Sequence, residues 1–169
     1  NQDSTARKFA HEEILHDFAA GKANVLLGTQ MVAKGHDIAN VTLVGILAAD
    51  SQLNLPDFRA GEKTFNLLTQ AAGRAGRGGK PGHVVLQTYD ADNEIIKLAA
   101  RQDYDAFAKQ ELLVREELLY PPFTQLLKIT IVDRTQNTAN VLAQRIVNYL
   151  QTIGVNEPNT DLTVMGPFP

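Results

Sequence analysis

The spacing of apolar residues along the first hundred positions alternates between a helical period and unbroken apolar runs. Ala6, Ala10, Ile14 and Phe18 recur at every fourth position and predict a helix that stops at Gly21. Unbroken apolar runs predict strands, which are expected at 24–29, 41–49 and 83–89. Helices are expected between and after them, at about 65–72 and 93–101. Apolar strands that alternate with helices are typical of a parallel sheet covered on both faces, so the fold class is α/β.

The pattern changes character beyond residue 103. A helix is expected at about 104–119, and it ends before Tyr120 because Pro121 disfavours helical geometry in the residue that precedes it. The elements expected after this turn are a strand at 125–132, a helix at 138–150 and a strand at 162–165. The predicted organisation is one α/β unit over 1–103, followed over 104–169 by a linking helix and the start of a smaller α+β domain.

Composition narrows the class of protein without identifying it. Of the 169 residues, 44% are hydrophobic and 21% are charged, which is typical of a folded globular chain. No apolar run approaches the roughly 18 residues that cross a bilayer, and the absence of cysteine excludes disulfides and thiolate zinc sites within these residues. The chain begins without an initiator methionine or a signal-peptide pattern, and we expect a soluble fragment of a longer protein.

Charge is distributed unevenly along the chain. The net charge of −3 argues against a protein that holds nucleic acid by general basicity. The window 59–80 nevertheless contains five basic residues and a single acidic one, Glu62. A short basic stretch of this kind is usually a solvated face, so the window alone assigns no function.

A cluster of glycines and arginines at 73–80 invites a phosphate-binding interpretation. It is not a P-loop, because Pro81 stands where the magnesium-binding hydroxyl would be, and the same proline interrupts a dinucleotide fingerprint. Arg74 and Arg77 lie three residues apart, and the small neighbouring glycines would let both guanidiniums approach a triphosphate. A flexible basic loop at the end of a helix is an equally good interpretation of the spacing alone.

Three further residues have chemistry that spacing alone leaves open. Thr29 follows a predicted strand, where a hydroxyl can meet phosphate or simply occupy a turn. Asp37 lies in a tight loop and could accept a hydrogen bond from a ribose hydroxyl, although a structural turn is the commoner role. His36 has no second ligand at metal-binding spacing, and we predict neither a metal site nor a Ser-His-Asp site.

The order of these motifs resembles a known family. The run from Gly28 to Asp37, followed by Gln70 to Arg77, resembles motifs V and VI of superfamily 2 helicases. The sequence at 50–60 and at 120–123 is similar to that of the replication-restart DNA helicases in particular. The bare Gly-Arg-x-Gly-Arg pattern also matches branch-migration and transcription-repair translocases. The resemblance implies a second RecA-like helicase lobe, followed by the first part of a C-terminal domain.

The resemblance assigns roles to the motif VI residues. It implies that Gln70, Arg74 and Arg77 face the ATP site, with Arg77 as the arginine finger and Arg74 as a second phosphate contact or an interface residue. A permanent cation at the departing phosphoryl group would stabilise the transition state more than the ground state.

Motif V supplies the remaining candidate residues. By resemblance, Gly35 and Asp37 face the nucleotide, and Thr29 with Gln30 contacts DNA. Asp50 follows Ala48-Ala49, where the family favours an acidic residue before the final Ala-Asp, so Asp50 is assigned no role.

The resemblance also implies cofactors and partners. ATP and Mg²⁺ would bind between this lobe and a missing lobe that carries the P-loop, and the zinc of the family would lie in a cysteine-rich insertion outside this chain. The implied setting is a bacterial cytoplasm, with forked or single-stranded DNA, primosome proteins and single-stranded-DNA-binding proteins as partners. The implied activity is 3′-to-5′ unwinding, and the fragment alone would be inactive. The alternative is a non-catalytic module that binds nucleic acid or primosome proteins.

Overall fold

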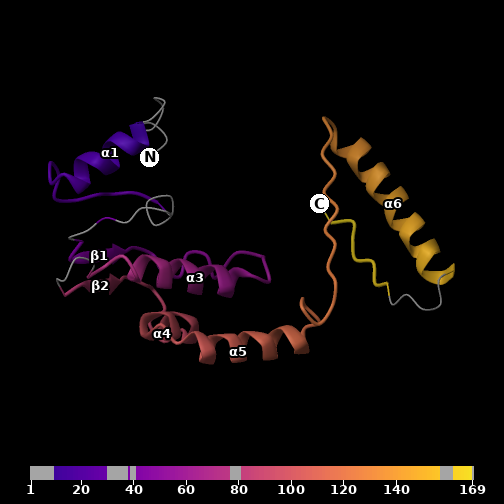
Figure 1. The fold of residues 1–169 in the computed structure, drawn as a ribbon. Coiled ribbons are helices and arrows are strands. Elements are labelled where there is room, and N and C mark those ends of the chain that lie inside the picture. The colour runs from indigo at the N-terminus through magenta and orange to yellow at the C-terminus, as the bar shows by residue number, and fades with distance from the viewer. Residues whose placement is uncertain (1–9, 30–37, 39–40, 77–80, 157–161, 169) are drawn as a thin grey trace. The chain divides into compact units, whose positions relative to one another are not determined.

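The computed structural model describes residues 10–29, 38, 41–76, 81–156 and 162–168. The chain divides into two compact units, Asn1–Thr124 and Gln125–Pro169. The described elements of the first unit, coloured from indigo to orange in Figure 1, are α1 (Ala10–Ala19), β1 (Leu43–Ile46), α3 (Ala60–Ala72), β2 (His83–Leu86), α4 (Glu94–Arg101) and α5 (Tyr104–Glu117). The second unit contains α6 (Gln136–Asn156).

The two described strands form a parallel pair, as the apolar runs predicted. Leu43 lies opposite His83, and Ile46 lies opposite Leu86. Backbone hydrogen bonds extend the pairing past both strands, since Gln87 donates to the carbonyl of Ile46 at 2.8 Å and Ala49 donates to the carbonyl of Gln87 at 2.9 Å. A parallel pair requires a crossover, and α3 provides it (Figure 1). The α/β class is therefore confirmed for a small two-stranded sheet with five described helices.

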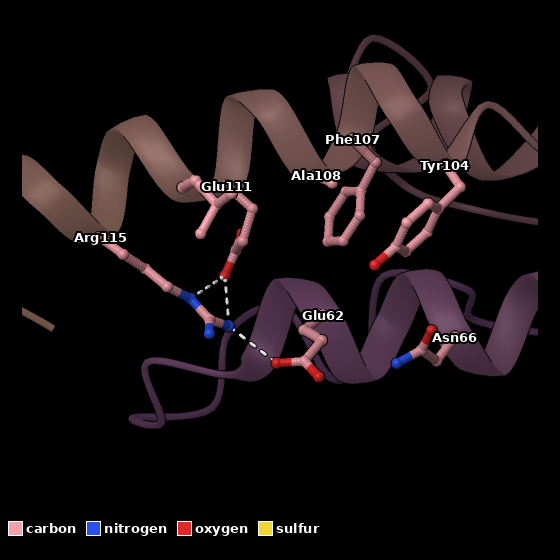
Figure 2. A pocket seen from close by; sticks show the side chains of 8 residues that line it. Glu62, Asn66, Tyr104, Phe107, Ala108, Glu111 and Arg115 are labelled. Atoms are coloured by element: carbon pink, nitrogen blue, oxygen red, sulfur yellow. Dashed lines mark hydrogen bonds and ion pairs between the residues drawn. The ribbon is translucent and has the colours of Figure 1, made fainter. Parts of the chain in front are cut away.

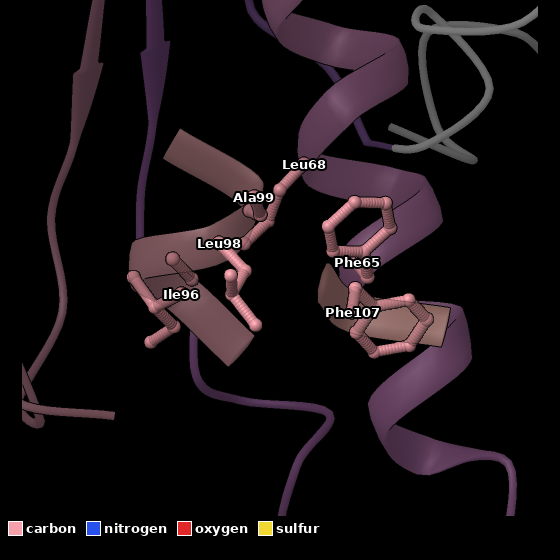
Figure 3. Close-up of a cluster of buried hydrophobic side chains, with 7 residues drawn as sticks. Phe65, Leu68, Ile96, Leu98, Ala99 and Phe107 are labelled. Atoms are coloured by element: carbon pink, nitrogen blue, oxygen red, sulfur yellow. The ribbon is translucent and has the colours of Figure 1, made fainter. Parts of the chain in front are cut away.

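An apolar cluster holds α3, α4 and α5 to the sheet. The cluster consists of seven buried residues, namely Ala49, Phe65, Leu68, Ile96, Leu98, Ala99 and Phe107. Figure 3 shows side chains from α3, α4 and α5 meeting in it. The rings of Phe65 and Phe107 stack with centroids 4.1 Å apart and planes inclined by 9°. Leu68, which is 1% exposed, completes the apolar stripe of α3 predicted from its spacing with Phe65.

A side-chain cap begins each of the helices α4 and α5. The carboxamide oxygen of Asn93 accepts a hydrogen bond from the backbone N–H of Ile95 at 3.1 Å and so caps α4. The carboxylate of Asp103 accepts from the N–H of Ala106 at 3.1 Å and caps α5. Between the two helices, Gln102 adopts a left-handed conformation with φ of 55° and ends α4.

The strand predicted at 24–29 is wrong. The described segment is irregular, and Val25 and Leu27 are 81% and 85% exposed. An apolar run gives a segment the propensity to be buried, but a strand also needs a neighbour that satisfies its backbone N–H and C=O groups. Within the described residues this segment pairs with no strand.

The second unit differs from its prediction in the same way. Residues 125–132 and 162–165 are extended but form no strand, so both strand predictions are wrong within the described ranges. Ile129 is 49% exposed and Val132 is 88% exposed, which indicates that this apolar run lacks a packing partner in the described chain. The helix predicted at 138–150 is confirmed and is longer, because α6 extends to Asn156.

The first predicted helix is described only in its second half. Residues 1–9 lie outside the described ranges, and α1 begins at Ala10. The helix ends where Gly21 adopts φ of 77° and donates to the carbonyl of Phe18 at 3.0 Å. A left-handed residue after a helix favours glycine, and this confirms Gly21 as the stop.

Candidate nucleotide and DNA site

The end of α3 carries the motif VI residues that the structure describes. Gln70 is exposed on the last turns of the helix, and Arg74 follows one turn later, half-buried. The helical hydrogen bonding continues past Ala72, since Arg74 donates from its backbone to the carbonyl of Ala71 at 3.1 Å. Gln70 lies in the last turn of α3 and Arg74 in the turn that follows the helix, so both residues stand at this end of α3.

Backbone contacts hold the turn that follows Arg74. Gly76 has φ of 80°, and its N–H donates to the carbonyl of Val41 at 2.9 Å, immediately before β1. Gly82 lies so close that a Cβ atom placed on it would collide with the backbone of Gly76. Sequence reasoning assigned Gly76 to the motif but missed Gly82, whose only sequence signal is that it is a glycine next to Pro81.

Of the other predicted site residues, Thr29 alone lies within the described ranges. Arg77, Gln30, Gly35 and Asp37 lie outside the described residues. Thr29 is described, is exposed and ends the irregular segment discussed above. The structure therefore places Gln70 and Arg74 at the same end of α3, and the roles assigned to all of these residues stay predictions.

The loop that follows β1 is supported by residues from the other strand. Ala48 has a left-handed φ of 48°, and its N–H donates to the side-chain oxygen of Gln87 at 2.7 Å. One carboxylate oxygen of Asp50 accepts from the N–H of Tyr89 at 3.3 Å, while the other is buried without a hydrogen-bond partner among the described residues. These partners are 39 residues apart in sequence, so no local pattern predicts them.

Two residues of the basic window share one carboxylate. Asp57 accepts hydrogen bonds from the ammonium of Lys63 at 2.5 Å, and from the backbone N–H and Nε of Arg59 at 2.9 and 3.4 Å. The Lys63 hydrogen bond, followed by the Arg59 backbone bond, lowers the pKa of Asp57 from its ordinary 3.8 to about 2. The charges of Arg59 and Lys63 are therefore paired with the carboxylate of Asp57 at the start of α3.

Acid is expected to weaken this arrangement in a defined pH range. Because folding lowers the pKa of Asp57 from 3.8 to about 2, its contribution to stability is present above pH 3.8 and is lost as the pH falls toward 2. Asp57→Asn removes the titrating group. The difference in melting temperature between wild type and Asp57→Asn should be largest near neutral pH and should shrink through this range. A difference that stays constant down to pH 2 would contradict the assignment.

A hollow of about 250 Å³ lies beside α3 and α5 (Figure 2). Its lining combines aromatic rings with charged groups, and consists of Glu62, Asn66, Tyr104, Phe107, Ala108, Glu111, Leu112 and Arg115. Burial lowers the pKa of Arg115, but hydrogen bonds to Glu62 and Glu111 outweigh burial and raise it above its ordinary value. Its guanidinium therefore stays charged while mostly enclosed.

The described residues include no cluster of three or more His, Cys, Asp or Glu side chains that could hold a metal ion. Among the helices described here, none has the length and apolar content needed to cross a membrane.

Comparison with known proteins first shows similarity to a class of domain. Residues 3–79 match the family described as helicase conserved C-terminal domain, the class that motifs V and VI predicted. Over almost the entire chain, the similarity is to the replication restart protein PriA. The chain is 47% identical to that of Bacillus subtilis (strain 168) over 98% of its length, 43% identical to that of Chlamydia pneumoniae over 99%, and 40% identical to that of Synechocystis over 100%.

These comparisons confirm the predicted resemblance to replication-restart helicases. The chain is similar to PriA proteins along nearly its whole length. It spans only about a fifth of the length of the curated relatives it matches, with coverage of 20%, 23% and 20%. The similarity therefore concerns one segment of those proteins.

Proposed function

We propose that this chain is the second motor lobe of a longer ATP-dependent DNA helicase that unwinds DNA in the 3′-to-5′ direction during replication-fork restart. The observation that carries the proposal is the match of residues 3–79 to helicase C-terminal domains, together with the relation to PriA. The position of Gln70 in the last turn of α3 and of Arg74 in the turn that follows is compatible with the proposal.

The proposed hydrolysis site lies between this lobe and a lobe outside the chain. Arg77 is the proposed arginine finger, with Arg74 as a second phosphate contact and Gln70 beside them. Guanidinium and amide donors are chemically suited to phosphate oxygens, which lack donors of their own. Magnesium would be held with the phosphates by the other lobe, and it would offset the charge on the phosphoryl oxygens.

Motif V is proposed to face both substrates. Gly35 and Asp37 would approach the nucleotide, where the carboxylate can accept from a ribose hydroxyl. Thr29 and Gln30 would contact the DNA backbone, and such contacts hold a strand without selecting its sequence.

The proposed cellular setting follows from the relation to PriA. We assign the longer protein to a bacterial cytoplasm, with forked or single-stranded DNA as substrate and with primosome and single-stranded-DNA-binding proteins as partners. Its zinc would lie in an insertion outside this chain.

The isolated chain should have no ATPase activity. A single lobe offers the arginines but no P-loop to cradle the phosphates, so the purified chain should hydrolyse ATP at the rate of a protein-free control with or without DNA. The full-length protein encoded by the gene should show DNA-stimulated hydrolysis. DNA-stimulated turnover by the isolated chain that is lost in its Arg77→Ala variant would overturn the two-lobe proposal. A full-length protein that binds DNA without hydrolysing ATP would favour the binding module.

Replacement of Thr29 should affect the DNA side of the full-length protein. Thr29→Ala removes a neutral hydroxyl and is expected to weaken DNA binding uniformly across sequences and to reduce DNA stimulation of the ATPase. The salt dependence of binding should stay unchanged, because no counterion-releasing charge is lost. The measurement is DNA affinity at several salt concentrations, with the melting temperature recorded in parallel. A lowered melting temperature with normal DNA stimulation per folded molecule would assign Thr29 to the turn alone.

A further inference from the structure

Arg115, in the last turn of α5, joins two helices through a branched set of hydrogen bonds (Figure 2). Its Nη2 donates to Glu62 in the first turn of α3 at 2.8 Å, and to Glu111 on its own helix at 2.9 Å. Its Nε donates to the same Glu111 oxygen at 3.0 Å. The side chains of Arg115 and Glu111 are only 13% and 17% exposed, so their pairing is largely enclosed, whereas Glu62 is 43% exposed and its bond to Arg115 is partly screened by solvent.

The same guanidinium also contacts the segments that flank the two helices. Its Nη1 donates to the backbone carbonyl of Pro121 at 3.3 Å. The Cζ atom of Arg115 lies 5.3 Å from the ring centroid of Phe58, within the range of a cation–π contact. Phe58 in turn stacks on Tyr120, with centroids 5.1 Å apart and planes inclined by 20°. Arg115 thus connects the loop before α3, α3 itself, α5 and the turn that closes the first unit.

The position of α3 matters because its far end carries the motif VI residues. The helix spans 13 residues and is about 20 Å long at the usual rise of about 1.5 Å per residue. Arg115 donates a hydrogen bond to Glu62 at one end of α3, and Arg74 lies just beyond the other end of the helix. A tilt of about 3° at the Glu62 end would move the far end by roughly 1 Å, and a misplacement of that size can lower a reaction rate by about 100-fold.

We propose that Arg115 is a positioning residue for ATP hydrolysis, acting through Glu62 to hold α3 at the angle that presents motif VI to the nucleotide. The inference rests on the proposed function, since it requires that motif VI acts on ATP. It adds a residue outside motifs V and VI, 38 positions beyond the proposed finger Arg77 in the sequence.

The arrangement requires arginine rather than a positive charge alone. Arg115 supplies donors in several directions from one plane, which serve Glu62, Glu111 and the Pro121 carbonyl together. Lysine has a compact ammonium that cannot reproduce the planar fork or its contact with the Phe58 ring. Arg115→Lys therefore keeps the positive charge beside Glu62 and Glu111 but loses some of the hydrogen bonds that connect α5 to α3.

The experiment uses the full-length protein with the variants Arg115→Lys and Glu62→Gln. Each should lower DNA-stimulated kcat by about 10- to 100-fold, while the affinity for ATP changes little, because the phosphate contacts themselves are untouched. The double variant should lose less than the product of the two single effects, since both remove the same connection. Arg101→Lys, an exposed arginine at the end of α4, is the matched control and should leave kcat unchanged.

The melting temperature of each variant separates positioning from general stability. Variants that melt lower but keep wild-type kcat per folded molecule would overturn the proposal, as would unchanged kcat in both single variants. Independent, multiplicative losses would also overturn it, because Arg115 would then not act through Glu62. Failure of the wild-type full-length protein to hydrolyse ATP would instead refute the proposed function itself.

Discussion

Arg77→Ala in the full-length protein is expected to lower kcat for ATP by about 10³- to 10⁵-fold, the range typical of an arginine finger. Nucleotide affinity should change little, because the finger interacts mainly with charge that develops in the transition state. Single-turnover hydrolysis and equilibrium binding of a fluorescent ATP analogue would measure the two quantities separately.

Arg77→Lys tests the geometry of the same group. Its ammonium keeps the charge but loses the planar fork, so it should restore only part of the lost kcat. Arg74→Ala is the comparison within the same motif. If Arg77→Ala kept kcat within a few-fold of wild type while Arg74→Ala lost it, the finger role would belong to Arg74.

The second large effect concerns stability. Phe65→Ala is expected to lower the free energy of unfolding by about 3–5 kcal/mol, because it removes a ring that is 2% exposed and stacked on Phe107. A loss of this size is a large share of the roughly 5–15 kcal/mol that stabilises a typical protein. Urea unfolding of the chain, followed by circular dichroism, would measure it.

Tyr89→Ala is the matched control for an aromatic truncation. Its side chain belongs to the same unit but is 89% exposed, so its removal should change the unfolding free energy by no more than about 0.5 kcal/mol. Equal losses for Phe65→Ala and Tyr89→Ala would show that the described cluster does not determine stability.

Much of the first unit could be predicted from local patterns. The stripe of Phe65 and Leu68 predicted α3, and the runs at 41–49 and 83–89 predicted the parallel pair, because burial and period are properties of a short window. The apolar runs at 24–29 and 125–132 wrongly predicted strands, because strand formation is not decided within a short window. Whether an apolar run becomes a strand depends on a neighbouring strand, and no window of sequence contains that information.

The candidate site divides in the same manner. Gln70 and Arg74 could be placed at the end of α3 from a local pattern, because the helical period of α3 and the glycines that follow it mark where the helix ends. Arg115 could not, since its partner Glu62 is 53 residues away in the sequence and the pair resembles any other exposed charges on two helices. The pair of Arg115 and Glu62 can be recognised only once α3 and α5 are seen packed together.

The close approach of Gly82 to Gly76 limits which substitutions this segment can accept. In a scan of every substitution, Gly82 should tolerate almost no side chain, because even a methyl group would meet the backbone of the motif VI turn. Such intolerance, a few residues from the arginines, is what a phosphate-binding glycine would also display. At Gly82 it would record a steric fit between two backbones, and a map of functional residues drawn from intolerance alone would wrongly include Gly82 in the proposed ATP site.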